Sequence, residues 1–150
     1  MSHSKLSIST DKFIIMTPHA RIICGIILLT VPTIIYGGYF LLTILSGRQK
    51  LPLTDFQKSM FRAGHAHAGV LVILSLIAEV LTDYAGLTPA MDHIVRIGFP
   101  LAAILVSAGF FASAAGRDIT KPNRRIGILY LGIAVLIISL IILGIGLIVA

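Results

Sequence analysis

The chain has 150 residues, of which 57% are hydrophobic and only 12% are charged, and its mean hydropathy is +1.00. A soluble domain of this length has too little interior to hide so much apolar surface. The composition therefore predicts a single-domain protein integral to a membrane. The 12 Lys and Arg residues outnumber the 6 Asp and Glu residues, but they fall between apolar runs. This placement indicates membrane orientation rather than a nucleic-acid partner.

Four apolar runs are long enough to cross a bilayer, which takes about 20 helical residues each. They cover residues 22–45, 62–83, 94–116 and 126–149. Short connections join them, so we expect an all-α fold, an integral membrane four-helix bundle.

Small side chains in the third and fourth runs predict where helices approach closely. In the third run, Ala108, Ala112 and Gly116 recur four residues apart, a spacing that lets two backbones come near each other. The fourth run carries Gly132 and two further glycines near its end. We expect these residues to serve bundle packing, with an oligomer contact as the alternative.

The connections differ in positive charge, which predicts the orientation of the chain. The first and third connections hold eight basic residues: Arg48, Lys50, Lys58, Arg62, Arg117, Lys121, Arg124 and Arg125. The opposite side holds three, namely Lys5, Lys12 and Arg21. Positive charge stays cytoplasmic, so we expect both termini outside the plasma membrane.

Two histidines, His65 and His67, stand at the start of the second run. Helical residues two apart point about 200° away from each other, so the pair cannot chelate one metal ion. The face of His67 is otherwise apolar and carries Ala63, Gly64, Val70, Leu71, Leu74 and Ala78. Such a face suits a large flat apolar ligand held by one nitrogen, and haem is the obvious candidate. A helix-end histidine that meets lipid headgroups is the alternative.

The face of His65 carries other polar groups. It includes Arg62, Gly69 and Glu79, and Glu79 stands where it can pair with Arg96 of the third run. Ionisable groups inside a membrane segment are costly and so are candidates for function. A proton or ion relay through His65 and Glu79 is one interpretation, and a polar contact near the outer interface is the other.

The residues Ala66-His67-Ala68-Gly69 resemble the Arg-Ala-His-x-Gly stretch that opens the second helix of styrene oxide isomerases, which are small four-span membrane proteins. The resemblance implies haem b with His67 as its axial metal ligand. It places His65 where the family has arginine, and Arg62-Ala63 recovers the Arg-Ala pair only with a shift. We therefore expect His67, His65, Gly64, Gly69 and Arg62 around the cofactor.

A second stretch, Gly109-Phe110-Phe111, resembles the family's Gly-Phe-Tyr, and Pro122-Asn123 lies in a similar third connection. The family opens epoxides on ferric haem acting as a Lewis acid, with an asparagine and a tyrosine that position the substrate. The corresponding residues here are Ile73 and Phe111, and a family aspartate falls near Ala103. Ile73 and Phe111 make no such hydrogen bonds.

By resemblance, then, we expect a haem with an apolar distal pocket, with Ile73, Phe111 and Ala103 as pocket candidates. Such a pocket favours a small apolar, diatomic or aromatic ligand, and makes epoxide isomerisation doubtful. The family also forms trimers with haem near the subunit interface, so the resemblance implies a homo-oligomer.

Two other classes of function stay open on the sequence. One is an accessory subunit of a larger membrane complex. The other is a small proton or solute transporter that uses His65, Glu79 and Arg96.

Overall fold

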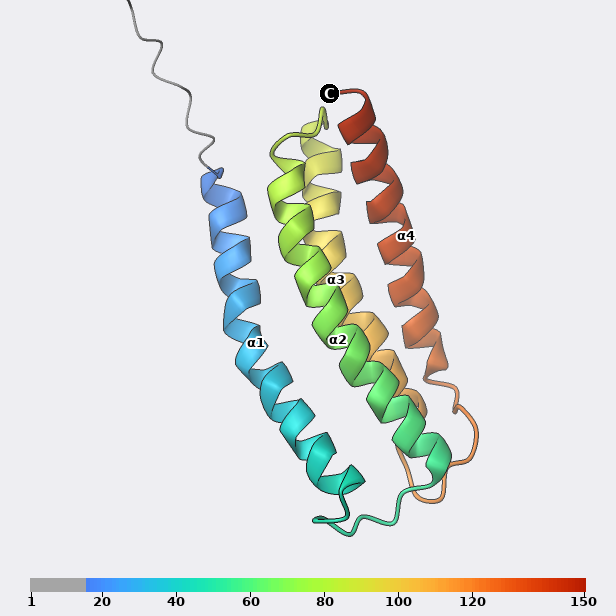
Figure 1. Cartoon of the computed structure of the whole chain (residues 1–150). Coiled ribbons are helices and arrows are strands. Elements are labelled where there is room, and N and C mark those ends of the chain that lie inside the picture. The colour runs from blue at the N-terminus through green and yellow to red at the C-terminus, as the bar shows by residue number, and fades with distance from the viewer. Residues whose placement is uncertain (1–15) are drawn as a thin grey trace, which may run out of the picture.

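The computed structural model describes residues 16–150, and within this range it contains four helices and no strand. The helices are α1 (Pro18–Leu45), α2 (Asp55–Thr82), α3 (Pro89–Ser113) and α4 (Ile126–Ile148), running up and down in turn (Figure 1). All four are long and apolar enough to cross a membrane, which confirms the predicted fold class. Lys5 and Lys12, which entered the predicted orientation, lie outside the described residues.

Threonine caps decide where three of the helices begin. The side chains of Thr17, Thr54 and Thr88 each accept a hydrogen bond from a backbone N–H in the first turn of the helix that follows. Thr54 forms a full capping box with Gln57, so α2 begins at Asp55, well before its apolar run. The start of α2, which carries the histidines, is therefore regular helix.

Buried Gln57 ties the start of α2 to the connection between α3 and α4. Its side-chain amide donates to the carbonyl oxygens of Ala114 (3.0 Å) and Gly116 (2.9 Å). The hydroxyl of Thr54 donates to the carbonyl of Ile119. These bonds satisfy carbonyl groups just beyond the end of α3, and they hold the start of α2 against it.

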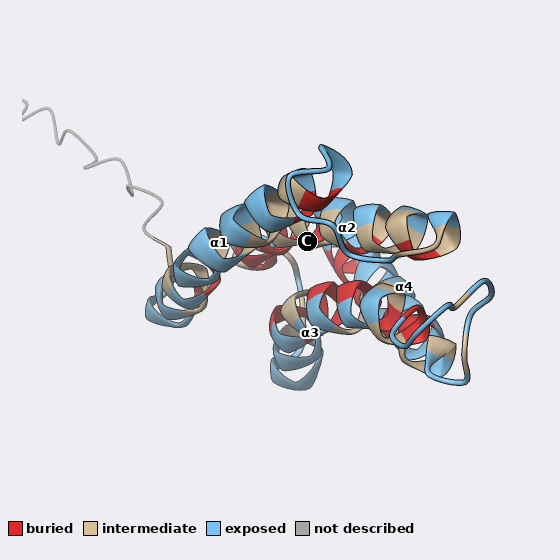
Figure 2. Cartoon of the chain, turned by 90° about the horizontal axis from the view of Figure 1, so that it is seen from below, coloured by how far each residue is buried: buried red, intermediate tan, exposed pale blue. Residues whose placement is uncertain are grey.

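The bundle is uneven, because α3 packs closely against both α2 and α4, while α1 lies at its edge and contacts mainly α2 (Figure 1). The buried residues face the space between the helices, and much of α1 is exposed (Figure 2). Two core clusters lie among α2, α3 and α4, one around Val106 and the other around Phe99. The exposed remainder is largely apolar, as a lipid environment requires.

The close contact between α3 and α4 depends on glycines other than those of the predicted stripe. Gly98 faces Ser139, and Gly109 lies against the backbone of Leu129. On α4, Gly132 lies against the backbone of Val106, so this glycine does serve bundle packing.

The predicted stripe of the third run does not make this contact. Ala108 is exposed, Ala112 is half-buried, and Gly116 lies beyond the end of α3. The spacing of four was present in the sequence, but the close approaches to α4 are at Gly98 and Gly109 instead.

Candidate functional site

His67 lies on the outer surface of α2 with its ring fixed in orientation. Its Nδ1 is 2.7 Å from the carbonyl oxygen of Ala63, one turn earlier. The ring packs against Phe110 of α3, with 4.8 Å between ring centroids and an interplanar angle of 32°. A carbonyl oxygen only accepts, so this bond requires the proton on Nδ1 and leaves the lone pair on Nε2.

His65 faces the other way, towards α1. A Cβ atom added at Gly38 would lie 2.7 Å from its Nε2, so the ring packs directly on the glycine backbone of α1. His65 also lines a cavity of about 390 Å³ together with Phe61 and Phe111, whose ring centroids are 5.6 Å apart. The prediction that the two histidines point in different directions is confirmed.

The small residues near the histidines have different surroundings. Gly64 is buried, and a Cβ atom there would lie 3.0 Å from side-chain atoms of both Phe110 and Phe111. Its missing side chain therefore lets Phe110 approach α2 and support the ring of His67. A Cβ atom at Gly69 would meet nothing within 4 Å, and the side chain of Arg62 is exposed.

The three pocket candidates from the resemblance lie apart. Ile73 is 60% exposed on the outer face of α2, and Phe111 lies in the cavity beside His65. Ala103 is buried in the core around Val106, and it also borders a second cavity between α1, α2 and α3. Within one chain, no single pocket collects all three of these described residues.

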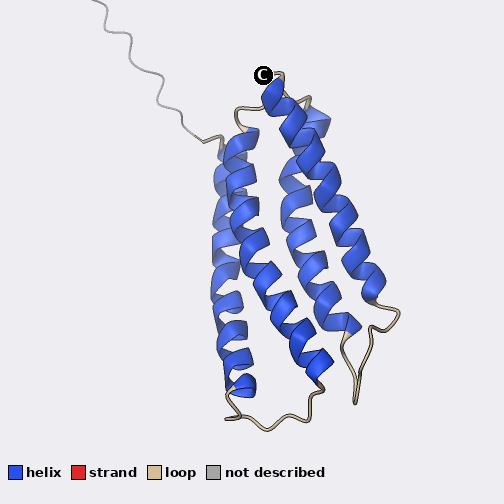
Figure 3. Ribbon diagram, turned by 45° about the vertical axis from the view of Figure 1, so that its right-hand side comes forward, coloured by secondary structure: helices blue, strands red, loops and turns tan. Residues whose placement is uncertain are grey.

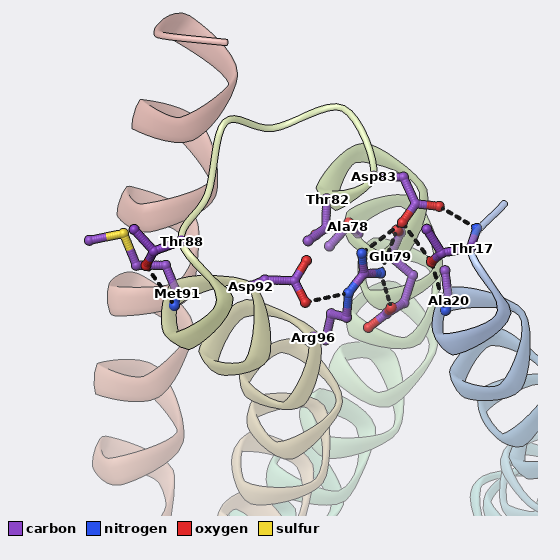
Figure 4. A network of polar contacts seen from close by, with 10 residues as sticks. All are labelled: Thr17, Ala20, Ala78, Glu79, Thr82, Asp83, Thr88, Met91, Asp92 and Arg96. Carbon is purple, nitrogen blue, oxygen red and sulfur yellow. Dashed lines mark hydrogen bonds and ion pairs between the residues drawn. The ribbon is translucent and has the colours of Figure 1, made fainter.

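At the opposite end of the bundle, Arg96 is surrounded by three carboxylates (Figure 4). Its guanidinium donates to Glu79 Oε2 (3.0 Å), to Asp83 Oδ1 (2.7 Å) and, through Nε, to Asp92 Oδ2 (2.9 Å). The backbone N–H and hydroxyl of Thr17 donate to Asp83 at 3.0 and 2.8 Å. We call these five residues the Arg96 cluster; it joins α1, α2 and α3.

The hydrogen bonds within this cluster shift the pKa of Asp83. Burial alone would raise the pKa of Asp83, but the hydrogen bonds from Thr17 and Arg96 outweigh it and hold that pKa below its usual value. The Arg96 side chain is only 4% exposed, so its guanidinium is enclosed by its partners within the bundle. Its ion pairs clamp α3 to the C-terminal end of α2, while Oε1 of Glu79 stays buried without a hydrogen-bond partner among the described residues.

The sequence predicted the Glu79–Arg96 contact, and the structure confirms it. Asp92, Asp83 and Thr17 were missed. Asp92 stands four residues before Arg96 on one helix face, a spacing that signals an ion pair. No comparable signal links Thr17 to Asp83, since they are 66 residues apart.

His65 and Glu79 are 14 positions apart on α2, which separates them by about 21 Å along the helix. Across the described range, residues 16–150, no three His, Cys, Asp or Glu side chains converge into a metal site.

Comparisons of the chain with protein-family models, with curated proteins and with solved structures found no match. The resemblance to styrene oxide isomerases rests on the quoted residues alone, so its implications for cofactor and activity stay predictions.

Proposed function

We propose that the protein is a haem b-binding membrane protein with Nε2 of His67 as the axial iron ligand. The observation that carries this proposal is the 2.7 Å contact between Nδ1 of His67 and the Ala63 carbonyl. A histidine ligand usually donates its other ring N–H to a carbonyl or carboxylate, which fixes the tautomer and the ring plane. His67 already has this arrangement, the residue is exposed, and its Nε2 makes no hydrogen bond within the described chain.

The residues around His67 fit a planar apolar group on the outer face of α2. Phe110 supports one side of the imidazole, and buried Gly64 makes room for Phe110. The neighbouring surface of α2 is apolar and exposed at Ala66 and Val70. Since a group bound there is covered by this chain on one side only, we propose that a second copy covers the other. A trimer is the arrangement that the resemblance implies.

When bound, ferric haem would supply a Lewis acid or a coordination position for a small ligand. The chain's own contribution is to hold the ligand nitrogen, and to surround the group with side chains that exclude water. Ile73 and Phe111 offer no hydrogen bond to a substrate oxygen, so we propose small-ligand or aromatic-ligand binding rather than efficient epoxide isomerisation. Purified protein incubated with styrene oxide should form little or no aldehyde.

We also propose that the histidine end faces the cytoplasm. Figure 3 shows the first and third connections, which are rich in Lys and Arg, at one end of the bundle. The C-terminus lies at the other end (Figure 1), as does the Arg96 cluster, which includes the residues that cap the start of α1 and the end of α2. Positive charge is retained on the cytoplasmic side, so a C-terminal alkaline phosphatase fusion in a bacterial host should be active and a fluorescent-protein fusion dark.

The cofactor is tested by the visible spectrum of protein purified in mild detergent from haem-replete cells. We expect a Soret band and, after conversion to the pyridine haemochrome, the spectrum of haem b. A colourless protein would contradict the proposal. A stable second polypeptide co-purifying with colourless protein would favour the accessory-subunit interpretation instead.

A further inference from the structure

A second cavity, of about 360 Å³, lies between α1, α2 and α3. Its walls are mainly apolar, with Ile26 from α1, Ala68 and Val72 from α2, and Pro100 and Ile104 from α3. The volume is at the small end of the range of about 300–1,000 Å³ that is typical of ligand pockets. It belongs to a different side of α2 from His67, because Ala68, Val72 and Ser75 share one helical stripe.

Four hydroxyl groups reach this cavity, and three of them already donate to their own helices. Thr30 donates to the carbonyl of Ile27 (2.7 Å), Thr33 to that of Thr30 (2.6 Å), and Ser75 to that of Leu71 (2.7 Å). Serine and threonine in helices commonly make this local bond.

Ser107 is the exception among these hydroxyls. Its side-chain oxygen is buried, the residue is 8% exposed, and the hydroxyl has no hydrogen-bond partner. An unpaired hydroxyl in an apolar surrounding is unfavourable, and the hydrocarbon core of a bilayer offers no water to satisfy it. The free donor therefore points to a ligand atom that accepts a hydrogen bond.

We propose that this cavity binds a small apolar molecule whose single oxygen accepts a hydrogen bond from Ser107. The ligand enters sideways from the bilayer, because α1 and α3 hardly touch, and exposed Ile26 and Ile104 form the rim between them. A lipid acyl chain of the same width would leave the Ser107 hydroxyl unpaired. The proposal does not depend on haem, since His67 is not among the residues that line this cavity and the hydrogen bond to the ligand comes from Ser107.

Benzophenone is a suitable probe, since it is apolar, has one carbonyl oxygen, and inserts into nearby C–H bonds under near-ultraviolet light. The full chain in lipid nanodiscs is irradiated with increasing benzophenone, and the modified peptides are identified by mass spectrometry. We expect saturable labelling of the cavity walls, on residues 26–34, 68–75 and 100–107. The competitor 1,1-diphenylethylene has the same shape without the oxygen.

The variant Ser107→Ala should raise the half-saturating benzophenone concentration roughly threefold to tenfold, the range expected for one lost neutral hydrogen bond. It should leave competition by 1,1-diphenylethylene unchanged. Ser75→Ala is the matched control: it removes a hydroxyl from the same cavity, but one already paired with Leu71. Ser75→Ala should change neither the half-saturating benzophenone concentration nor the competition by 1,1-diphenylethylene. Ala68→Leu should reduce labelling, because the larger side chain fills the cavity.

Three results would overturn the proposal. Labelling that never saturates, or that maps outside the cavity, would mean that the cavity holds no ligand. Equal half-saturation in Ser107→Ala and the parent protein would mean a site for hydrocarbon chains only. Equal weakening in Ser75→Ala and Ser107→Ala would remove the special role of the free hydroxyl. His67→Ala should label like the parent, so failure of the haem proposal leaves this test intact.

Discussion

The two ends of the bundle use polar side chains in opposite ways. At one end, Arg96 is buried and its guanidinium is shared among three carboxylates. At the other end, His67 makes one hydrogen bond with its backbone-facing nitrogen and keeps the second nitrogen free at the surface. The guanidinium of Arg96 therefore joins parts of the chain, whereas Nε2 of His67 has no hydrogen-bond partner within the part of the chain that the structure describes and is available to a ligand.

This difference separates the Arg96 cluster from His67, which the sequence alone had made equal candidates for function. Ionisable residues in membrane segments are candidates for function by default. Glu79 and Arg96 meet that description as well as His67 does, and their ion pair holds α2 against α3, while Oε1 of Glu79 is buried without a hydrogen-bond partner in residues 16–150. The following variants test the contrast, starting with the largest expected change in stability.

Arg96→Ala should destabilise the protein most, by about 3–5 kcal/mol, because it leaves buried carboxylates without their partner. The free energy of unfolding can be measured by SDS titration in mixed micelles, followed by circular dichroism. Arg117→Ala is the control, because that side chain is 92% exposed and should matter by less than about 0.5 kcal/mol. Similar values for the two variants would show that the Arg96 cluster is not a clamp.

Gly109→Ala should have a smaller effect, about 1–3 kcal/mol, since a Cβ atom there meets the backbone of Leu129 and must push α4 away. Gly144→Ala makes the same substitution where a Cβ atom meets nothing within 4 Å. The same titration should show no loss, or a slight gain, for Gly144→Ala. Equal destabilisation of the two would contradict the packing described for α3 and α4.

Asp83→Asn should have the smallest effect, and that effect should depend on pH. The pKa of Asp83 in the folded protein lies below its unfolded value of about 3.9. Its stabilising contribution is therefore complete at neutral pH and is lost as the pH falls through the folded pKa. The stability difference between the parent and Asp83→Asn should shrink on acidification below about pH 4.

Asp118→Asn is the control for this pH dependence, because the Asp118 side chain is 78% exposed. Its difference from the parent should be small at every pH. A difference for Asp83→Asn that grows as the pH falls would contradict a lowered pKa of Asp83 in the folded protein.

Much of the fold was predictable, because the length of an apolar run alone decides whether a helix spans a bilayer. The first residue of each helix was harder to predict. The helix α2 begins at Asp55, before its apolar run, because a local capping box extends the helix at its N-terminus. The directions of His65 and His67 followed from helical geometry. What each ring touches did not, because the contacts with Phe110 and Gly38 depend on how neighbouring helices pack.

Buried polar groups were the hardest to predict. The sequence gives no sign that Thr17 reaches Asp83, or that Ser107 alone among four cavity hydroxyls lacks a partner. Both depend on the exact rotation of a helix about its axis. Hydrophobic runs constrain that rotation weakly, since every face of a membrane helix is apolar.

The haem assignment is tested most directly by comparing two variants that each lose one imidazole, purified from the same haem-replete cells. The account predicts that His67→Ala lacks the Soret band, while His65→Ala keeps it at the parent's ratio of haem to protein. Imidazole added to His67→Gly should restore the band by replacing the missing ligand. A Soret band that survives in His67→Ala and disappears in His65→Ala would contradict the assignment.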